Sequence, residues 1–209
     1  MSDEVLLRHR ILWIALVLVI LGLMGAAIAT KMKDSGPPLP VLGNVGAFSF
    51  VDQTGKTLTA DELKGKVWIA DFIFTRCAGT CVLMTHAMNR LNKDLADVPV
   101  TFVSFSMDPT HDTPAVLAEY AKNAGATPER WRFLTGKQED MYRLTREDFM
   151  QAVKEEGGSP EEPILHSTRF VVVDGKGRIR GFYSGTEAEA QKKLIDDVRR
   201  LTHSKRDLD

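Results

Sequence analysis

One apolar run that ends at the only two cysteines constrains the fold of this sequence more than any other feature. Val67 to Phe74 is rich in β-branched and aromatic residues and is interrupted only by Asp71, which predicts a strand buried on both faces. Cys77 follows this run closely. Further on, apolar residues recur at three- and four-residue steps, as on one face of a helix: Cys81, Met84, Met88, Leu91 and Leu95. We therefore expect both thiols at the start of a helix, where unpaired backbone N–H groups and the helix dipole favour the thiolate.

The N-terminal residues predict a membrane anchor. Residues 11–29 carry no charge, and at ~1.5 Å per residue their helix would be about 28 Å long, close to the thickness of a bilayer core. A cleaved secretory signal is the alternative, because Ala27-Ile28-Ala29 resembles a cleavage site, but the apolar part of a signal is usually shorter. We expect residues 1–10 to form a short flank, residues 11–29 the anchor, and residues 30–43 a linker stiffened by prolines.

Residues 44–203, followed by a short tail at 204–209, predict one α/β domain. The expected elements, in chain order, are a hairpin over 48–58, a strand over 67–74, a helix over 81–95, a strand over 100–105, a helix over 115–124, a strand over 131–134, an interrupted helix over 138–154, a hairpin over 168–183 and a helix that ends near 203. This order is that of a thioredoxin-like fold, a central mixed sheet flanked by helices, with an N-terminal hairpin. The charges are balanced overall, so nothing predicts binding to nucleic acid.

The two cysteines predict a soft metal site. Thiolates four residues apart can face the same way on a helix, and with one imidazole they favour copper(I) over magnesium or calcium, with zinc as the competitor. Four of the five histidines lie in the flank, on the far side of the cysteine helix, in a polar turn or in the tail: His9, His86, His111 and His203. His166 ends a long loop just before an expected strand, so it is the best-placed third ligand.

Three sequence blocks give the chain a resemblance to a known family. They are FIFTRCAGTC (Phe72 to Cys81), FVSFSMDPTHDTPAVLAEY (Phe102 to Tyr120) and LHSTRFVVVDGKGRIRGFY (Leu165 to Tyr183). With FSFVDQTGKTL (Phe48 to Leu58), they span nearly the whole expected domain. The chain resembles the Sco/SenC family, membrane-anchored thioredoxin-fold proteins involved in copper delivery during cytochrome c oxidase assembly.

The resemblance implies that Cys77, Cys81 and His166 bind a copper ion and that the domain lies on the extracytoplasmic side of a membrane. It also implies a partner, either the copper-centre subunit of the oxidase or another copper chaperone. The family usually has a proline after each cysteine, and here those places hold Ala78 and Val82. Because the sulfurs and their spacing are kept, we expect metal binding to persist, while the replacements affect the rigidity and redox potential of the turn and the recognition of partners.

The expected function is that of a copper metallochaperone that passes its ion on by ligand exchange. The alternative is a membrane-tethered thiol-disulfide oxidoreductase, in which Cys77 attacks a partner disulfide and Cys81 resolves the mixed disulfide. ADFIFTRCAGTC resembles the segment before the redox pair of thioredoxins, although thioredoxins have two residues between the cysteines and this chain has three. A structural disulfide is a plainer interpretation, but it would close too short a loop to stabilise the domain much. Likewise, His166 could simply cap the following strand.

Other polar and sulfur-containing residues receive structural interpretations. The helical spacing of Met84 and Met88 indicates core packing more than metal binding. Asp108 and Asp112 are expected to shape a turn and a helix start. Asp71 is either a buried, hydrogen-bonded carboxylate or a proton relay to a thiol, and the sequence does not separate these two roles. Arg76 would favour a thiolate at Cys77, but an exposed arginine beside a loop is common.

Overall fold

The computed structural model describes residues 10, 12–25, 37–77, 79–150 and 168–203. The chain divides into two units, Met1–Pro38 and Leu39–Asp209. In the first unit, residues 12–25 are helical, and their large apolar side chains are exposed. Within the described residues, no helix combines the length and hydropathy that crossing a membrane requires.

A mixed sheet of eight strands, counted over the described residues, forms the centre of the second unit. In spatial order its strands are β1 (Gly43–Asn44), β8 (Arg178–Ser184), β7 (Arg169–Val173), β4 (Val67–Ile73), β5 (Val100–Ser106), β6 (Trp131–Thr135), β2 (Ser49–Asp52) and β3 (Thr57–Thr59). β4, β5 and β6 run parallel, and every other neighbouring pair is antiparallel. The expected thioredoxin-like α/β fold with a mixed sheet is therefore confirmed, and β2 and β3 form the N-terminal hairpin.

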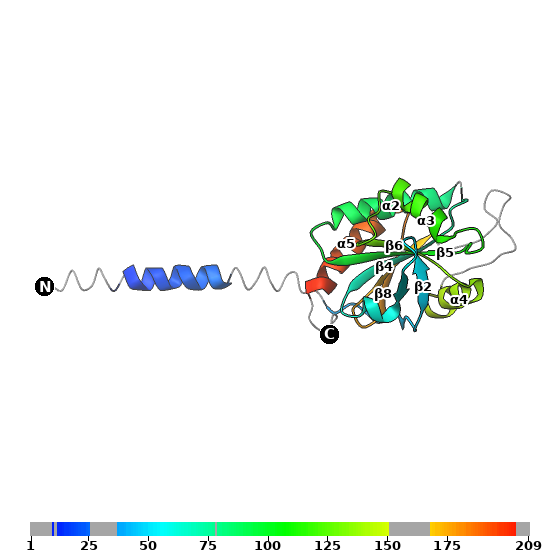
Figure 1. Cartoon of the computed structure of the whole chain (residues 1–209). Coiled ribbons are helices and arrows are strands. Elements are labelled where there is room, and N and C mark those ends of the chain that lie inside the picture. Colours follow the sequence, from blue (N-terminus) through cyan, green and yellow to red (C-terminus); the bar gives the residue numbers. More distant parts are fainter. Residues whose placement is uncertain (1–9, 11, 26–36, 78, 151–167, 204–209) are drawn as a thin grey trace. The chain divides into compact units, whose positions relative to one another are not determined.

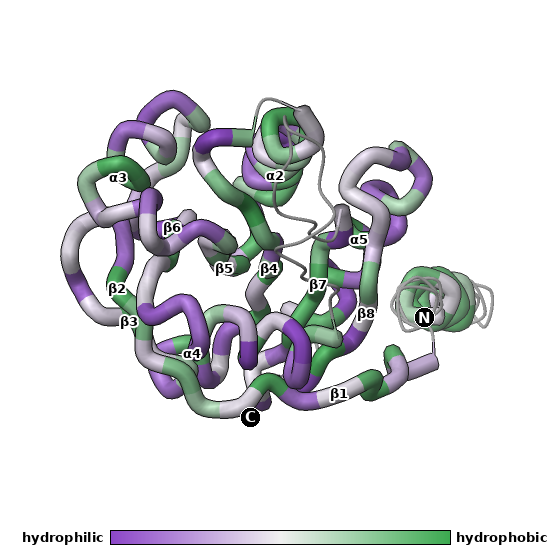
Figure 2. The backbone as a smooth tube through the Cα atoms, turned by 90° about the vertical axis from the view of Figure 1, so that its right-hand side faces the viewer, coloured by the Kyte–Doolittle hydropathy of each residue, from purple (hydrophilic) through white to green (hydrophobic). Residues whose placement is uncertain are grey.

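Helices cover both faces of this sheet (Figures 1 and 2). One face packs against α2 (Thr80–Asp94), α3 (Pro114–Asn123) and α5 (Ala188–His203). The other face packs against η1 (Ala60–Leu63), α4 (Gln138–Arg143) and the π-helical turn η2 (Leu144–Asp148). The sheet thus separates two apolar cores, and β4 is buried from both sides, as its continuous apolar sequence predicts.

Alternation along β4 decides which side chains lie beneath the cysteine helix. Val67, Ile69 and Ile73 belong to the core under α2, whereas Trp68 and its even-numbered neighbours belong to the opposite core. Successive side chains of a strand point to opposite faces. Asp71 therefore points into the core under α2, toward the helix that carries Cys81.

The structure differs from the sequence expectations mainly after α4 and at β1. Helical geometry after α4 passes through the π-turn η2 and reaches Phe149, followed by Met150 with φ of 52°. Thr145 donates to the Met141 carbonyl within this turn, while its neighbours Leu144 and Phe149 are fully buried. The short strand β1 was not predicted, because two residues are too few to show an alternating pattern.

Candidate metal-binding site

The cysteines lie at a tight turn that joins β4 to α2. The Cys77 amide donates to the Phe74 carbonyl at 3.2 Å, which closes the turn, and α2 begins at Thr80 with Gly79 as its N-cap. The backbone N–H of Cys81 donates to the Cys77 sulfur at 3.4 Å. Both residues are thiols, with Cys77 5% exposed and Cys81 fully buried. The two sulfurs thus meet at the helix start, as the spacing predicts.

Burial dominates the electrostatics of Cys81. It raises the pKa of the Cys81 thiol far above its ordinary value, and the neighbouring Cys77 and Asp71 raise this pKa further. The Cys81 sulfur therefore keeps its proton at neutral pH. A cation that replaces this proton relieves the repulsion between neighbouring negative groups, so the arrangement favours a bound positive ion over a bare thiolate.

Asp71 is fully buried, and neither of its carboxyl oxygens has a hydrogen-bond partner among the described residues. Burial raises the pKa of Asp71 to about 7, and the nearby Ser104 hydroxyl on β5 lowers this pKa by a smaller amount. Its burial agrees with both sequence interpretations of Asp71, a structural carboxylate and a proton relay to a thiol. A buried polar group without a partner is costly, and such groups gather at functional sites.

Tyr120 on α3 extends the same buried surroundings. Its hydroxyl lies 2.7 Å from the Thr85 hydroxyl on α2. Burial raises the pKa of Tyr120, and Cys81, Asp71 and Cys77 raise it further. Tyr120, Cys81, Asp71 and Cys77 are therefore within electrostatic reach of one another.

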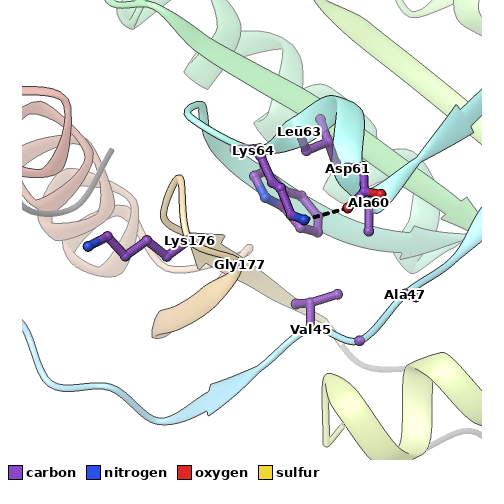
Figure 3. A pocket seen from close by; sticks show the side chains of 10 residues that line it. Val45, Ala47, Ala60, Asp61, Leu63, Lys64, Lys176 and Gly177 are labelled. Carbon is purple, nitrogen blue, oxygen red and sulfur yellow. Dashed lines mark ion pairs between the residues drawn. The ribbon is translucent and has the colours of Figure 1, made fainter. Parts of the chain in front are cut away.

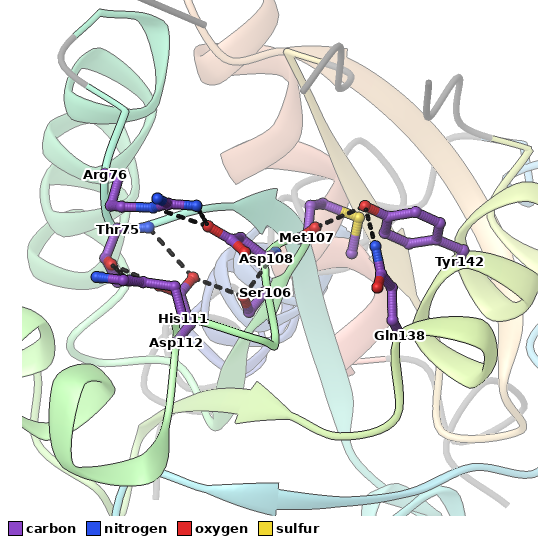
Figure 4. A network of polar contacts seen from close by, with 9 residues as sticks. All are labelled: Thr75, Arg76, Ser106, Met107, Asp108, His111, Asp112, Gln138 and Tyr142. Atoms are coloured by element: carbon purple, nitrogen blue, oxygen red, sulfur yellow. Dashed lines mark hydrogen bonds and ion pairs between the residues drawn. The ribbon is translucent and has the colours of Figure 1, made fainter. Parts of the chain in front are cut away.

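A polar network attaches the cysteine turn to the segment after β5 (Figure 4). The Asp112 carboxylate accepts hydrogen bonds from the Thr75 amide at 3.2 Å, the Thr75 hydroxyl at 2.5 Å and the Ser106 hydroxyl at 2.6 Å. The Arg76 guanidinium donates to Asp108 at 2.5 Å and 3.0 Å. Thr75 and Arg76, the two residues before Cys77, are thus each held by a carboxylate of the segment after β5.

This network was only partly foreseen from the sequence. Thr113 caps the start of α3, whereas Asp108 and Asp112 shape only the turn before it, where the Asp108 carbonyl accepts from the His111 and Asp112 amides. Their partners Thr75 and Arg76 were missed as positioning residues, because a pairing across more than thirty positions leaves no local pattern. The one available signal was that these residues fall in two of the sequence blocks that carry the family resemblance.

His166 and Ala78 lie outside the described residues, but the chain just after His166 can be placed. Gly185 donates to the Thr168 carbonyl at 2.9 Å, and a Cβ added at Gly185 would overlap the Met84 thioether. Met84 is one helical turn beyond Cys81. Thr168, the first described residue after the gap, is thus hydrogen-bonded to a glycine that packs against Met84 on α2.

The other sequence candidates take structural positions. Met84 and Met88 are fully buried in the core under α2, which confirms their packing role. His86 is exposed on α2, consistent with the expectation that it points away from Cys81. Val82, where the family usually has proline, is 39% exposed, and its amide donates to Gly79 at 3.1 Å.

A shallow cavity of about 240 Å³ lies elsewhere, near the start of β4 (Figure 3). Trp68, Val45 and Gly177 are among the residues that line it, and Lys64 at its rim is paired with Asp61 at 2.7 Å. The Lys176 side chain extends away from Lys64. Because this cavity contains no converging polar groups and no sulfur, the cysteine turn is the better candidate for chemistry.

Comparisons with known proteins identify the family of the chain. The sequence model of the SCO1/SenC family matches residues 42–203. The SCO1 protein homolog of Bacillus subtilis is 36% identical over 163 residues, which cover 77% of this chain and 83% of the relative.

Solved structures give the same result. BsSco, a member of the Sco family of cytochrome c oxidase assembly proteins in which a disulfide switch was identified, superposes with a TM-score of 0.72 at 34% identity, covering 80% of this chain and 99% of that one. Yeast Sco1 with copper bound superposes with a TM-score of 0.62 at 23% identity, covering 77% of this chain and 90% of that one, and so shows the shared fold.

Proposed function

Because this chain belongs to the SCO1/SenC family, we propose that it binds one copper ion through Cys77, Cys81 and His166 and delivers it to a respiratory oxidase during assembly. The observation that carries the proposal is the pair of buried thiols at the start of α2. Thr168, two residues beyond His166 in the sequence, is hydrogen-bonded to Gly185, which packs against Met84, and Met84 is one helical turn after Cys81; this supports His166 as the third ligand. The copper bound by yeast Sco1 supports the choice of metal.

The donor set fits copper chemically. Two thiolates and one imidazole form a soft donor set with a low coordination number, which suits copper(I) better than magnesium or calcium. Delivery requires no electron transfer: a ligand of the acceptor replaces one thiolate at a time, and each released sulfur regains a proton. The high pKa of the Cys81 thiol favours this return of the proton and hence the release of the ion.

A copper(I) competition titration on the reduced chain tests the proposal. We expect Cys77→Ser and Cys81→Ser to weaken the affinity by several orders of magnitude, and His166→Ala to weaken it about 10- to 100-fold. His86→Ala is the matched control, because His86 lies exposed on the same helix. Equal affinities for His166→Ala and His86→Ala would eliminate the three-ligand site, and equal affinity for the serine variants would eliminate the whole proposal.

A second function, thiol-disulfide exchange, is favoured by the two adjacent thiols and by the disulfide switch identified in BsSco. In this reaction the Cys77 thiolate attacks a partner disulfide and one partner sulfur leaves as a thiolate. Cys81 then attacks the Cys77 sulfur, which releases the second partner thiolate. The partner is reduced and the Cys77–Cys81 pair is oxidised, so both metal transfer and this reaction begin from the dithiol.

Trapping separates the two functions. An oxidoreductase is expected to accumulate a mixed disulfide through Cys77 in Cys81→Ser, and the trap disappears when Cys77 is also replaced. If Cys81→Ser accumulates no mixed disulfide with any membrane or extracytoplasmic protein, the oxidoreductase function is excluded and only copper binding is left.

We further propose that residues 11–29 anchor the chain in a membrane, that the predicted linker, residues 30–43, spans only the part before Leu39, where the second unit begins, and that the domain lies on the extracytoplasmic side. The uncharged run at 11–29 supports this arrangement. The proposed acceptor is the copper-centre subunit of the oxidase or another copper chaperone. Retention of the full chain in membranes after carbonate washing, with residues 44–203 open to protease only from the extracytoplasmic side, is the expected result; release by carbonate would contradict it.

A further inference from the structure

His111 is the exposed member of the network that holds the cysteine turn. Its side chain is 40% exposed, and its Nδ1 lies 3.1 Å from Asp112 Oδ1 and 3.3 Å from the Thr75 hydroxyl (Figure 4). Asp108, His111 and Asp112 place ligand-type atoms within 4.8 Å of one another. Both carboxylates already accept hydrogen bonds, from Arg76 on one side and from Thr75 and Ser106 on the other. The imidazole is thus the ligand still available to a metal.

The hydrogen bonds determine which imidazole nitrogen is available. An ionised carboxylate only accepts, so the proton between His111 and Asp112 belongs to Nδ1. The Thr75 hydroxyl donates its own proton to Asp112, so its oxygen is also an acceptor toward Nδ1. With the proton on Nδ1, the neutral ring carries its lone pair on Nε2. A carboxylate that holds one imidazole nitrogen while the other binds metal is a recurring arrangement in metal sites.

The charges around His111 favour a cation. Asp108 and Asp112 contribute two negative charges, and the Arg76 guanidinium compensates one of them. One negative charge is left over, on the buried Asp112 carboxylate that contacts the ring. A cation at Nε2 would be attracted by this charge across a partly buried ring, where screening by solvent is reduced.

His111 also lies at the edge of the cysteine turn. Thr75, which its ring contacts, is two residues before Cys77, and the Cys77 amide closes the turn onto Phe74. The Thr75 and Cys77 α-carbons are therefore within about 7 Å of each other. Cys77 is only 5% exposed and Cys81 is fully buried, so an incoming ion meets the turn before it meets both sulfurs.

We propose that His111 Nε2 is an auxiliary copper ligand that receives the ion at the protein surface and passes it to Cys77 and Cys81. This inference rests on the proposed copper-binding function. Copper(I) first exchanges one donor-supplied ligand for Nε2. The Cys77 thiol then loses its proton to water as the copper–sulfur bond forms, and Cys81 does the same as the bond to Nε2 breaks. The copper stays in one oxidation state throughout, and each thiol releases one proton.

The decisive variant is His111→Asn. The asparagine amide can donate to Asp112 as Nδ1–H does, so the network is retained, but nothing replaces Nε2. His86→Asn is the matched control, because that histidine is exposed on α2 away from the turn. Copper(I) is presented to the full reduced chain as a complex with a weak small-molecule chelator, and uptake is followed by stopped flow.

We expect His111→Asn to slow uptake about tenfold while equilibrium affinity changes less than about twofold, and His86→Asn to leave both unchanged. A second readout uses copper(II) and a Cys77→Ser/Cys81→Ser/His166→Ala variant, whose electron paramagnetic resonance spectrum should show a nitrogen ligand that is lost on adding His111→Asn but not on adding His86→Asn. Equal uptake rates for His111→Asn and wild type would overturn the proposal. Failure of the wild type to bind copper at all would instead overturn the proposed function, so the two failures are distinguishable.

Discussion

Two of the fully buried carboxylates of this domain, Asp174 and Asp71, lie in opposite surroundings. Asp174, in the turn between β7 and β8, accepts hydrogen bonds from Arg180 at 2.6 Å and Arg178 at 2.8 Å and from two backbone amides. Asp71, beneath the cysteine helix, has no hydrogen-bond partner among the described residues. We call the regions around them the hairpin end (Asp174, Arg178 and Arg180) and the cysteine end (Asp71, Cys77 and Cys81).

The hairpin end is built for stability. Arg180 is 3% exposed and donates to Asp174 and also to the carbonyls of Leu39 and Pro40, so it attaches the start of the domain to the sheet. Every charge there has a partner of opposite sign. At the cysteine end, by contrast, no positively charged side chain among the described residues is paired with Asp71, and burial raises the pKa of both Asp71 and Cys81. This difference supports the proposal that a positive ion completes the cysteine end.

The largest expected effect lies at the hairpin end. Arg180→Ala leaves Asp174 buried with one of its two arginines removed and leaves the Leu39 and Pro40 carbonyls without their donors. Losing one partner of a buried ion pair typically costs 3–5 kcal/mol, so we expect about this decrease in the free energy of unfolding in urea. Arg178→Ala is the control, since Arg178 is 27% exposed and should matter less. A decrease below about 1 kcal/mol for Arg180→Ala would remove the contrast between the two ends.

The next effect concerns Asp71 and depends on pH. Its pKa is about 7 in the folded protein against an ordinary value of 3.8, so below pH 3.8 its ionisation favours neither state. As the pH rises toward 7, the unfolded chain ionises first and folding becomes less favourable. Asp71→Asn removes this dependence, and the stability of the variant relative to wild type should rise by roughly 4 kcal/mol across that range, then level off.

Urea unfolding of Asp71→Asn and wild type at matched pH values from 4 to 8 measures this difference. A difference that stays constant with pH would show that Asp71 ionises normally in the folded protein. Burying the Asp71 carboxylate would then not destabilise the folded protein, and the contrast with Asp174 would fail.

A smaller effect is expected at Asp112, which accepts hydrogen bonds from the turn that precedes Cys77. Asp112→Asn exchanges one acceptor oxygen for a donor and so disrupts the bonds from Thr75 and Ser106. We expect faster amide hydrogen exchange at Thr75 and Cys77 and a copper(I) affinity lowered about 10- to 100-fold, as for other residues that orient metal ligands. Asp97→Asn, a surface change, is the control. Unchanged exchange at the turn would show that the network does not position Cys77.

The smallest expected effect restores a family proline. Val82 occupies the first turn of α2, where proline is tolerated, but Val82→Pro also removes the hydrogen bond from its amide to Gly79. The gain from a stiffer unfolded chain and this loss nearly cancel, so thermal unfolding should change by less than about 1 kcal/mol. Copper affinity should be unchanged. A large loss of affinity would mean that the turn depends on valine for its shape.

The comparison also shows what the sequence could predict. Hydrophobic periodicity was sufficient for β4, for α2 and for the buried positions of Met84 and Met88, because these depend on local spacing. The place of the two thiols at a helix start followed from the same pattern. Asp71 was visible as an interruption of an apolar run, but the absence of a partner is a property of the packed core and not of the run.

The contacts that fix each end were not predictable. Arg180 reaches residues about 140 positions earlier in the chain, and Thr75 reaches Asp112 across 37 positions. Such pairings depend on the assembled sheet and have no signature in spacing or composition. The role of His166 was proposed from its position before a predicted strand and from family resemblance, and it lies outside the described residues.

The central claim is that the cysteine end is completed by copper bound to Cys77, Cys81 and His166. X-ray absorption spectroscopy of the copper(I)-loaded full chain tests it most directly, because it counts the ligand atoms around the metal. We predict two sulfur atoms and one imidazole nitrogen, with the nitrogen lost in His166→Ala and a sulfur lost in Cys81→Ser. Copper surrounded only by nitrogen and oxygen, or an environment that neither substitution changes, would contradict the account.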